Sequence, residues 1–153
     1  MSQAGPWTNE DFEHLSWHDV NVHGWRLDTF DSDEGCADLV LDIDFILHWE
    51  KSGSAFLFTV CRADLCFHQV LGLRLALDYA TPTAGMCPFS IDGIVRELLV
   101  APNGHRSYRW RLPVNWPRGL LEFEAPAFTQ TLTGTPRVQA AQWLAGEHRD
   151  DAN

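Results

Sequence analysis

The sequence lacks the short motifs by which many enzymes and nucleotide-binding proteins are recognised. It contains no G-x-S-x-G, no G-x-G-x-x-G and no Walker A pattern. These absences exclude the familiar glycine-rich phosphate loops and disfavour nucleophilic catalysis by a serine. No apolar run approaches the ~20 residues of a membrane helix, so no membrane association is expected. Residues 1–14 hold neither lysine nor arginine and no apolar stretch. We therefore expect no secretory signal and a cytoplasmic location.

Positive charge and paired cysteines are also scarce. The 153 residues include 11 Lys and Arg against 21 Asp and Glu, which gives a net charge of −10. An acidic surface repels phosphate backbones, so we expect no nucleic-acid partner and favour a basic protein partner. Among the four cysteines the closest spacing is between Cys61 and Cys66, without a second matching pair. This spacing predicts free thiols in or near the core, and neither a metal site nor a cofactor.

Alternation of apolar and polar residues is the main pattern that the sequence does contain. Short alternating segments are separated by turns rich in glycine and proline throughout residues 1–153. The pattern predicts one mostly β domain, an antiparallel sandwich or barrel of about seven to nine strands. Short helices are expected near the termini, over 8–15 and 137–148, with loose ends at about 1–6 and 147–153.

The central part of the chain predicts a hairpin of long strands. One strand is expected from about Cys36 to Glu50, and KSGS at 51–54 is expected to form the turn. Residues 55–62 are apolar on both faces, which predicts a central strand or one that is covered on both faces. Residues 64–79 then read as one long strand, or as two short strands broken near Gly72.

The strand LVLDIDFILHWE, residues 39–50, carries the first candidate site. Its odd positions are apolar, whereas its even positions include Asp42, Asp44, His48 and Glu50. Neighbouring carboxylates with a histidine can bind a divalent cation or act as acid and base. We favour a solvated outer face instead, with the acids opposite Arg109 and Arg111, where each pair contributes only ~0.2–1 kcal/mol. In a closed barrel the same face could line a ligand cavity.

Other segments offer weaker candidates. In SWHDVNVHG, residues 16–24, two histidines and an aspartate lie close together, but a metal would need a third ligand from elsewhere. The run HRSYRWR at 105–111 interleaves arginine with aromatic residues. We expect Tyr108 and Trp110 to lie in the core, and a protein–protein contact is the stronger of the functional interpretations. The loops at 84–93 and 113–119 hold aromatic and apolar residues, and loops on a rigid β scaffold often carry function.

Four segments together resemble a group of small bacterial β-rich proteins without an assigned activity. They are SWHDVNVHG, LVLDIDFILHW, GMCPFSIDGI and HRSYRWRLPVNWP. The resemblance implies a bacterial, cytosolic protein with a single β domain. It transfers no catalytic residue to this chain.

These observations predict a small acidic binding module without enzymatic activity. It would capture a protein partner through a basic patch on that partner, in the manner of an immunity protein. The candidate binding residues are Asp42, Asp44, His48, Glu50, Arg109 and Arg111. The alternative is a ligand-binding barrel or small hydrolase in which polar residues such as Asp44, His48 and Arg109 converge on a cavity. A third hypothesis is a homodimer formed through a sheet edge or the AFLFTV strand.

Overall fold

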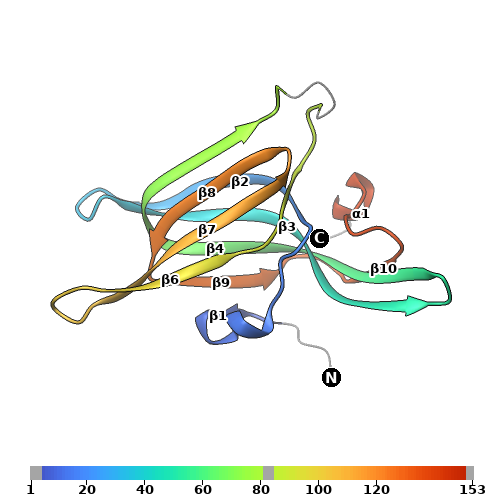
Figure 1. The fold of residues 1–153 in the computed structure, drawn as a ribbon, viewed down its shortest axis with the longest axis horizontal. Coiled ribbons are helices and arrows are strands. Elements are labelled where there is room, and N and C mark those ends of the chain that lie inside the picture. Colours follow the sequence, from blue (N-terminus) through green and yellow to red (C-terminus); the bar gives the residue numbers. More distant parts are fainter. Residues whose placement is uncertain (1–4, 81–84, 151–153) are drawn as a thin grey trace.

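Antiparallel strands make up most of the protein (Figure 1), of which a computed structural model describes residues 5–80 and 85–150. The strands are β1 (Trp7–Thr8), β2 (Val20–Asp31), β3 (Cys36–Ser52), β4 (Ala55–Asp78), β5 (Phe89–Ile91), β6 (Val95–Val100), β7 (Arg106–Trp116), β8 (Arg118–Ala125), β9 (Ala127–Leu132) and β10 (Arg137–Gln139). The helical elements are a 3-10 helix, η1 (Asn9–His14), and a short α-helix, α1 (Gly146–Asp150). The predicted mostly antiparallel β fold is confirmed.

The strand pairings follow one another around a barrel-like sheet. In order they join β2 to β3, β3 to β4, β4 to β8, β8 to β7, β7 to β5 and β5 back to β2. The 24-residue β4 makes this possible, because one of its edges pairs successively with β10, β9 and β8. Gly72 lies at a register shift with a φ of +62°, a conformation that glycine adopts without a steric penalty. The predicted break near Gly72 is therefore an irregularity within one continuous strand.

Aromatic side chains fill the interior of this sheet. Phe67 lies at its centre, with ring centroids 4.7 Å from Phe123 and 5.0 Å from Trp110. On β3 the odd positions from Leu39 to Phe45 are buried in the same core, as their alternation predicts. Burial of this much aromatic and aliphatic surface is the main stabilising contribution to such a domain.

The β3–β4 hairpin confirms the predicted turn, and residues 55–62 lie in β4 between β3 and β10, but they are not covered along their whole length. Ser52 pairs with Ala55, and the intervening Gly53 has a φ of +64°. The hairpin extends beyond the rest of the sheet, where β10 pairs with it (Figure 1). Only the second half of 55–62 reaches the core, because Phe56 is exposed near the hairpin tip whereas Val60 is fully buried.

The N-terminal helix forms as a 3-10 helix within the predicted range. The backbone N–H of Thr8 donates to Asp11 Oδ2 at 2.8 Å, which closes the N-terminal turn. The side chain of Asn9 fixes η1 to β9, since its Nδ2 donates to the Pro126 carbonyl and its Oδ1 accepts from the Phe128 N–H.

The predicted helix over 137–148 is wrong. Residues Arg137–Gln139 form β10, which takes the free edge of β4 beside Phe58–Val60. Gln139 Nε2 then donates to the carbonyls of Ala141 and Trp143, so the chain turns away from the strand. Only Gly146–Asp150 is helical. The last described residues are also not loose, because Arg149 is buried against the sheet.

Candidate functional site

The chain's own C-terminal segment covers the face of β3 that carries the two aspartates. Asp44 is 0% exposed, and its carboxylate accepts hydrogen bonds from three groups. They are His23 Nε2 at 2.7 Å, the Leu144 N–H at 2.9 Å and the Arg149 guanidinium. This face is therefore part of the protein interior, and the expected solvated strand surface is wrong at Asp44. The three donors hold the carboxylate in one position.

Asp42 joins the same network from two residues earlier on β3. It accepts from Arg149 and lies 3.3 Å from Arg62 Nε. Arg62 also donates to the backbone carbonyl of Arg149 at 3.4 Å, so it links the sheet to α1 a second time. Asp42 and Asp44 are thus neutralised within the chain and do not present a free acidic surface to a partner.

The arginines that were predicted to face these aspartates have other partners. Arg111 on β7 lies 3.5 Å from Glu122 on β8. Arg109 stands opposite Glu124 on β8 and Glu97 on β6 in the strand register. The predicted opposition of Arg109 and Arg111 to the β3 acids is therefore wrong, and the six candidate residues do not form one site.

The two histidines of residues 16–24 also go to different places. His18 lies 3.3 Å from both Asp19 and Asp92, at an exposed rim of the molecule. Its Nδ1 is 3.1 Å from the Asp92 carbonyl. That backbone contact, with the Asp19 carboxylate second, raises the pKa of His18 above 6.5. His23 belongs instead to the Asp44 network, so these histidines do not share a metal.

His48 is the one predicted residue that lines a large groove. The groove has a volume of about 1280 Å³ and lies between η1, the middle of β3 and the segment after β9. Its walls consist of Trp7, Asp11, His14, Leu15, Ser16, Phe45, Ile46, Leu47, His48, Trp49, Thr59, Leu132, Gly134 and Pro136. A register shift between Ile46 and His48 breaks the alternation of β3, so that consecutive residues contribute to one wall.

The chemistry of the groove is aromatic and slightly acidic. Trp49 is 58% exposed and packs against Phe56 with ring centroids 5.5 Å apart. His14 and His48 supply polar edges, and Asp11 supplies the carboxylate. None of the described residues that line the groove is a lysine or an arginine. The groove is therefore suited to an apolar ligand that carries positive charge. The remaining predicted residue, Glu50, is exposed on the hairpin beside Trp49.

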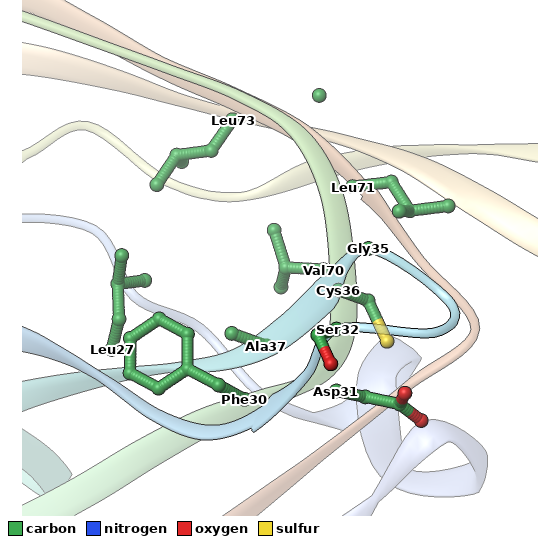
Figure 2. Close-up of a pocket in the computed structure, with 11 residues that line it drawn as sticks. Leu27, Phe30, Asp31, Ser32, Gly35, Cys36, Ala37, Val70, Leu71 and Leu73 are labelled. Carbon is green, nitrogen blue, oxygen red and sulfur yellow. The ribbon is translucent and has the colours of Figure 1, made fainter.

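A smaller pocket of about 360 Å³ opens at the β2–β3 turn (Figure 2). Its walls are mainly apolar and include Leu27, Val70, Leu73 and Phe30, of which Phe30 is 73% exposed. The thiol of Cys36 also lines it, and desolvation followed by the Asp31 carboxylate raises the pKa of that thiol. The cysteine is therefore mostly protonated near neutral pH, which makes it a poor nucleophile.

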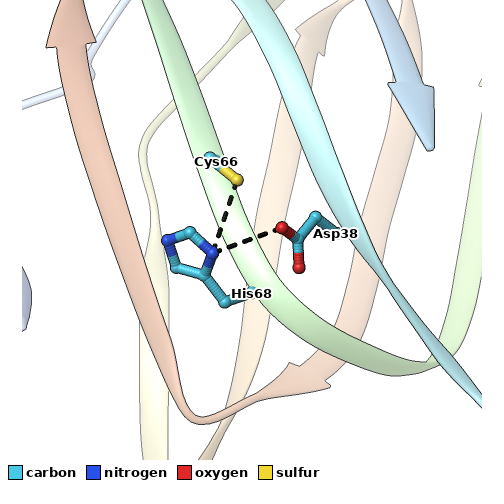
Figure 3. A group of neighbouring side chains, drawn as sticks. All are labelled: Asp38, Cys66 and His68. Atoms are coloured by element: carbon cyan, nitrogen blue, oxygen red, sulfur yellow. Dashed lines mark hydrogen bonds and ion pairs between the residues drawn. The ribbon is translucent and has the colours of Figure 1, made fainter. Parts of the chain in front are cut away.

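A cluster that the sequence prediction missed lies on the outer face of β3 and β4. Figure 3 shows His68 Nδ1 between Cys66 Sγ, at 3.7 Å, and Asp38 Oδ2, at 3.4 Å. Burial, and next the Asp38 carboxylate, raise the pKa of Cys66 to about 11. Without a metal ion the thiol is mostly protonated at neutral pH, so it is not activated as a nucleophile. The sequence feature that could have indicated this cluster is the two-residue spacing of Cys66 and His68, which places both side chains on one face of a strand.

Comparisons with family models, curated proteins and solved structures gave no match to this chain. The resemblance to small bacterial β-rich proteins therefore stays a prediction. Within residues 5–80 and 85–150, no helix has the length and apolar character needed to cross a membrane.

Proposed function

We propose that this protein is a non-enzymatic binding module that captures a cationic, apolar segment of a protein partner in the groove beside η1 and β3. The observation that carries the proposal is the groove itself, which combines aromatic walls with a carboxylate and holds no cationic side chain among its described lining residues. The net charge of −10 adds a long-range attraction for a basic partner and would increase the association rate.

The size of the groove and its surroundings favour a polypeptide over a small molecule. At about 1280 Å³ the groove exceeds the roughly 300–1,000 Å³ of ordinary small-ligand pockets. The apolar surface also continues beyond it, because Val138 on β10 is 63% exposed and pairs with Thr59, a lining residue. Exposed tryptophans such as Trp49 are enriched among the residues that dominate protein–protein affinity.

The packed interior favours this groove over a cavity inside the barrel-like sheet. Trp110 and Phe67 occupy the centre of the fold and are 0% exposed. Asp44 is held by Arg149, and Arg109 stands opposite glutamates on other strands, so neither converges with His48. The proposal keeps the cytoplasmic location and the immunity-protein-like role that we expect from the sequence. The surface that binds the partner is, however, the groove and not the β3 face that carries Asp42 and Asp44.

Two labelled peptides of equal length test the proposal by fluorescence anisotropy. One alternates lysine with leucine and tryptophan, and the other has glutamate at each lysine position. We expect the cationic peptide to bind about tenfold or more tightly than the acidic one, an advantage that shrinks as salt is added. Equal affinity of the two peptides, or binding of neither, would argue against the proposal.

A pair of matched variants locates the binding. Trp49→Ala removes an exposed ring from the groove, and we expect the affinity for the cationic peptide to fall by about tenfold or more. Trp25→Ala is the control, because Trp25 is 46% exposed on β2 and does not line the groove. An equal effect of both substitutions would mean that the peptide binds outside the groove.

A further inference from the structure

We propose that Asp38, Cys66 and His68 form a zinc-binding site on the outer face of the sheet. The site is separate from the groove, and its three donor atoms come from two adjacent strands, β3 and β4. Each side chain is partly exposed, so a metal ion can reach it from solvent without a rearrangement of the fold.

Two of the three separations between the donor atoms match those of a tetrahedral zinc site. Zinc bonds of about 2.0 Å to nitrogen and about 2.3 Å to sulfur place those two ligands about 3.6 Å apart, and nitrogen and oxygen ligands about 3.4 Å apart. The corresponding distances here are 3.7 Å between Cys66 Sγ and His68 Nδ1, and 3.4 Å between His68 Nδ1 and Asp38 Oδ2. All three donor atoms lie within 4.8 Å of one another.

Neighbouring groups hold two of the ligands in position. His68 Nε2 lies 2.8 Å from Thr129 Oγ1, so that Nε2–H can donate to the hydroxyl while Nδ1 keeps its lone pair for a metal. The second oxygen of Asp38 accepts from the Gln69 N–H at 3.0 Å. Gln69 has a φ of +55°, an uncommon conformation for a residue other than glycine. That backbone conformation orients the N–H toward Asp38.

The donor set selects zinc over the common hard cations. A thiolate, an imidazole and a carboxylate are all ordinary zinc ligands, whereas Ca²⁺ and Mg²⁺ prefer oxygen atoms alone. Three protein ligands leave the fourth tetrahedral position for a water molecule. The expectation of no metal site rested on the absence of cysteine pairs, but this arrangement needs only one cysteine.

Metal titration of the purified, chelator-treated full chain tests the site, with Zn²⁺ and Co²⁺ as probes. We expect one ion per chain and, with Co²⁺, the charge-transfer absorption of a thiolate ligand together with the visible bands of a tetrahedral ion. Addition of Zn²⁺ should abolish these bands, whereas excess Mg²⁺ should not. Absence of the thiolate band, or an ion held without it, would overturn the proposal.

Variants identify the ligands. Cys66→Ser should remove the thiolate band, whereas Cys36→Ser, a control at another partly exposed cysteine, should leave it unchanged. Thr129→Val replaces the hydroxyl that contacts His68 by a methyl group, and we expect zinc affinity to fall about 10–100-fold. Circular dichroism confirms that each variant is folded. Retention of the thiolate band in folded Cys66→Ser, or its loss in Cys36→Ser, would contradict the assignment.

Discussion

Replacement of Asp44 by alanine is expected to lower the free energy of unfolding by about 3–5 kcal/mol, because it removes one partner of a buried ion pair and leaves the buried donors around it without their acceptor. The Asp44 side chain is 0% exposed and that of Arg149 is 8% exposed. The substitution would leave Arg149 with Asp42 as its remaining carboxylate partner, and would leave the Leu144 N–H without its acceptor.

Urea denaturation followed by tryptophan fluorescence measures this change. With an m-value of about 2 kcal/mol/M, a loss of about 4 kcal/mol moves the midpoint by about 2 M at unchanged slope. Asp28→Ala is the control, because Asp28 forms an exposed ion pair with Arg26 that is worth at most about 1 kcal/mol. If Asp44→Ala lowers the free energy of unfolding by no more than Asp28→Ala does, the buried network does not hold the C-terminal segment on the sheet.

A double substitution separates the charge from the packing. Asp44→Leu combined with Arg149→Met removes both buried charges and keeps apolar volume between the sheet and α1. We expect this variant to recover much of the stability that Asp44→Ala loses, because the desolvation cost disappears with the pair. A double variant that is less stable than the single one would show that the individual hydrogen bonds, and not the unpaired charge, dominate.

Two further predictions concern close packing and pH. Gly119→Ala would place a Cβ 2.3 Å from the Ala76 carbonyl oxygen, so we expect a loss of about 1–3 kcal/mol in the same urea assay, whereas Gly24→Ala, with nothing within 4 Å, should cost far less. An equal loss of stability in Gly119→Ala and Gly24→Ala would refute the close approach of Gly119 to the Ala76 carbonyl. The contact with the Asp92 carbonyl should give His18 a pKa above 6.5 in an NMR titration. Its contribution to stability is then fully present below pH 6.5 and is lost as the pH rises through the folded pKa. A value at or below 6.5 would contradict the contact.

The alternation of β3 predicted its core face correctly, because a strand places every second side chain on the same side. It could not predict what covers the opposite face. The partner of Asp44 is Arg149, 105 residues later in the sequence, and it arrives in a segment whose composition resembles a longer helix. Periodicity identifies residues that share a face, whereas the chain topology decides whether that face meets solvent.

Two other features could not be predicted from the alternation of residues alone: the position of His48 in the groove and the meeting of Asp38 with Cys66 and His68. His48 reaches the groove because a bulge interrupts β3 after Ile46, and no glycine marks that position in the sequence. At the bulge on β2, between Val22 and Gly24, a glycine does stand at the irregularity, as is typical of such positions. Cys66 and His68 share a face by their spacing, but Asp38 joins them only through the register of β3 against β4.

The most direct test of the proposed function is to map the cationic peptide on the protein by two-dimensional NMR. We expect the amide shifts to change at groove residues such as Leu47, His48 and Leu132, and to stay constant around Leu27 and Leu73 in the smaller pocket. Shift changes confined to the smaller pocket, or spread evenly over the surface, would contradict the assignment of the groove as the binding site.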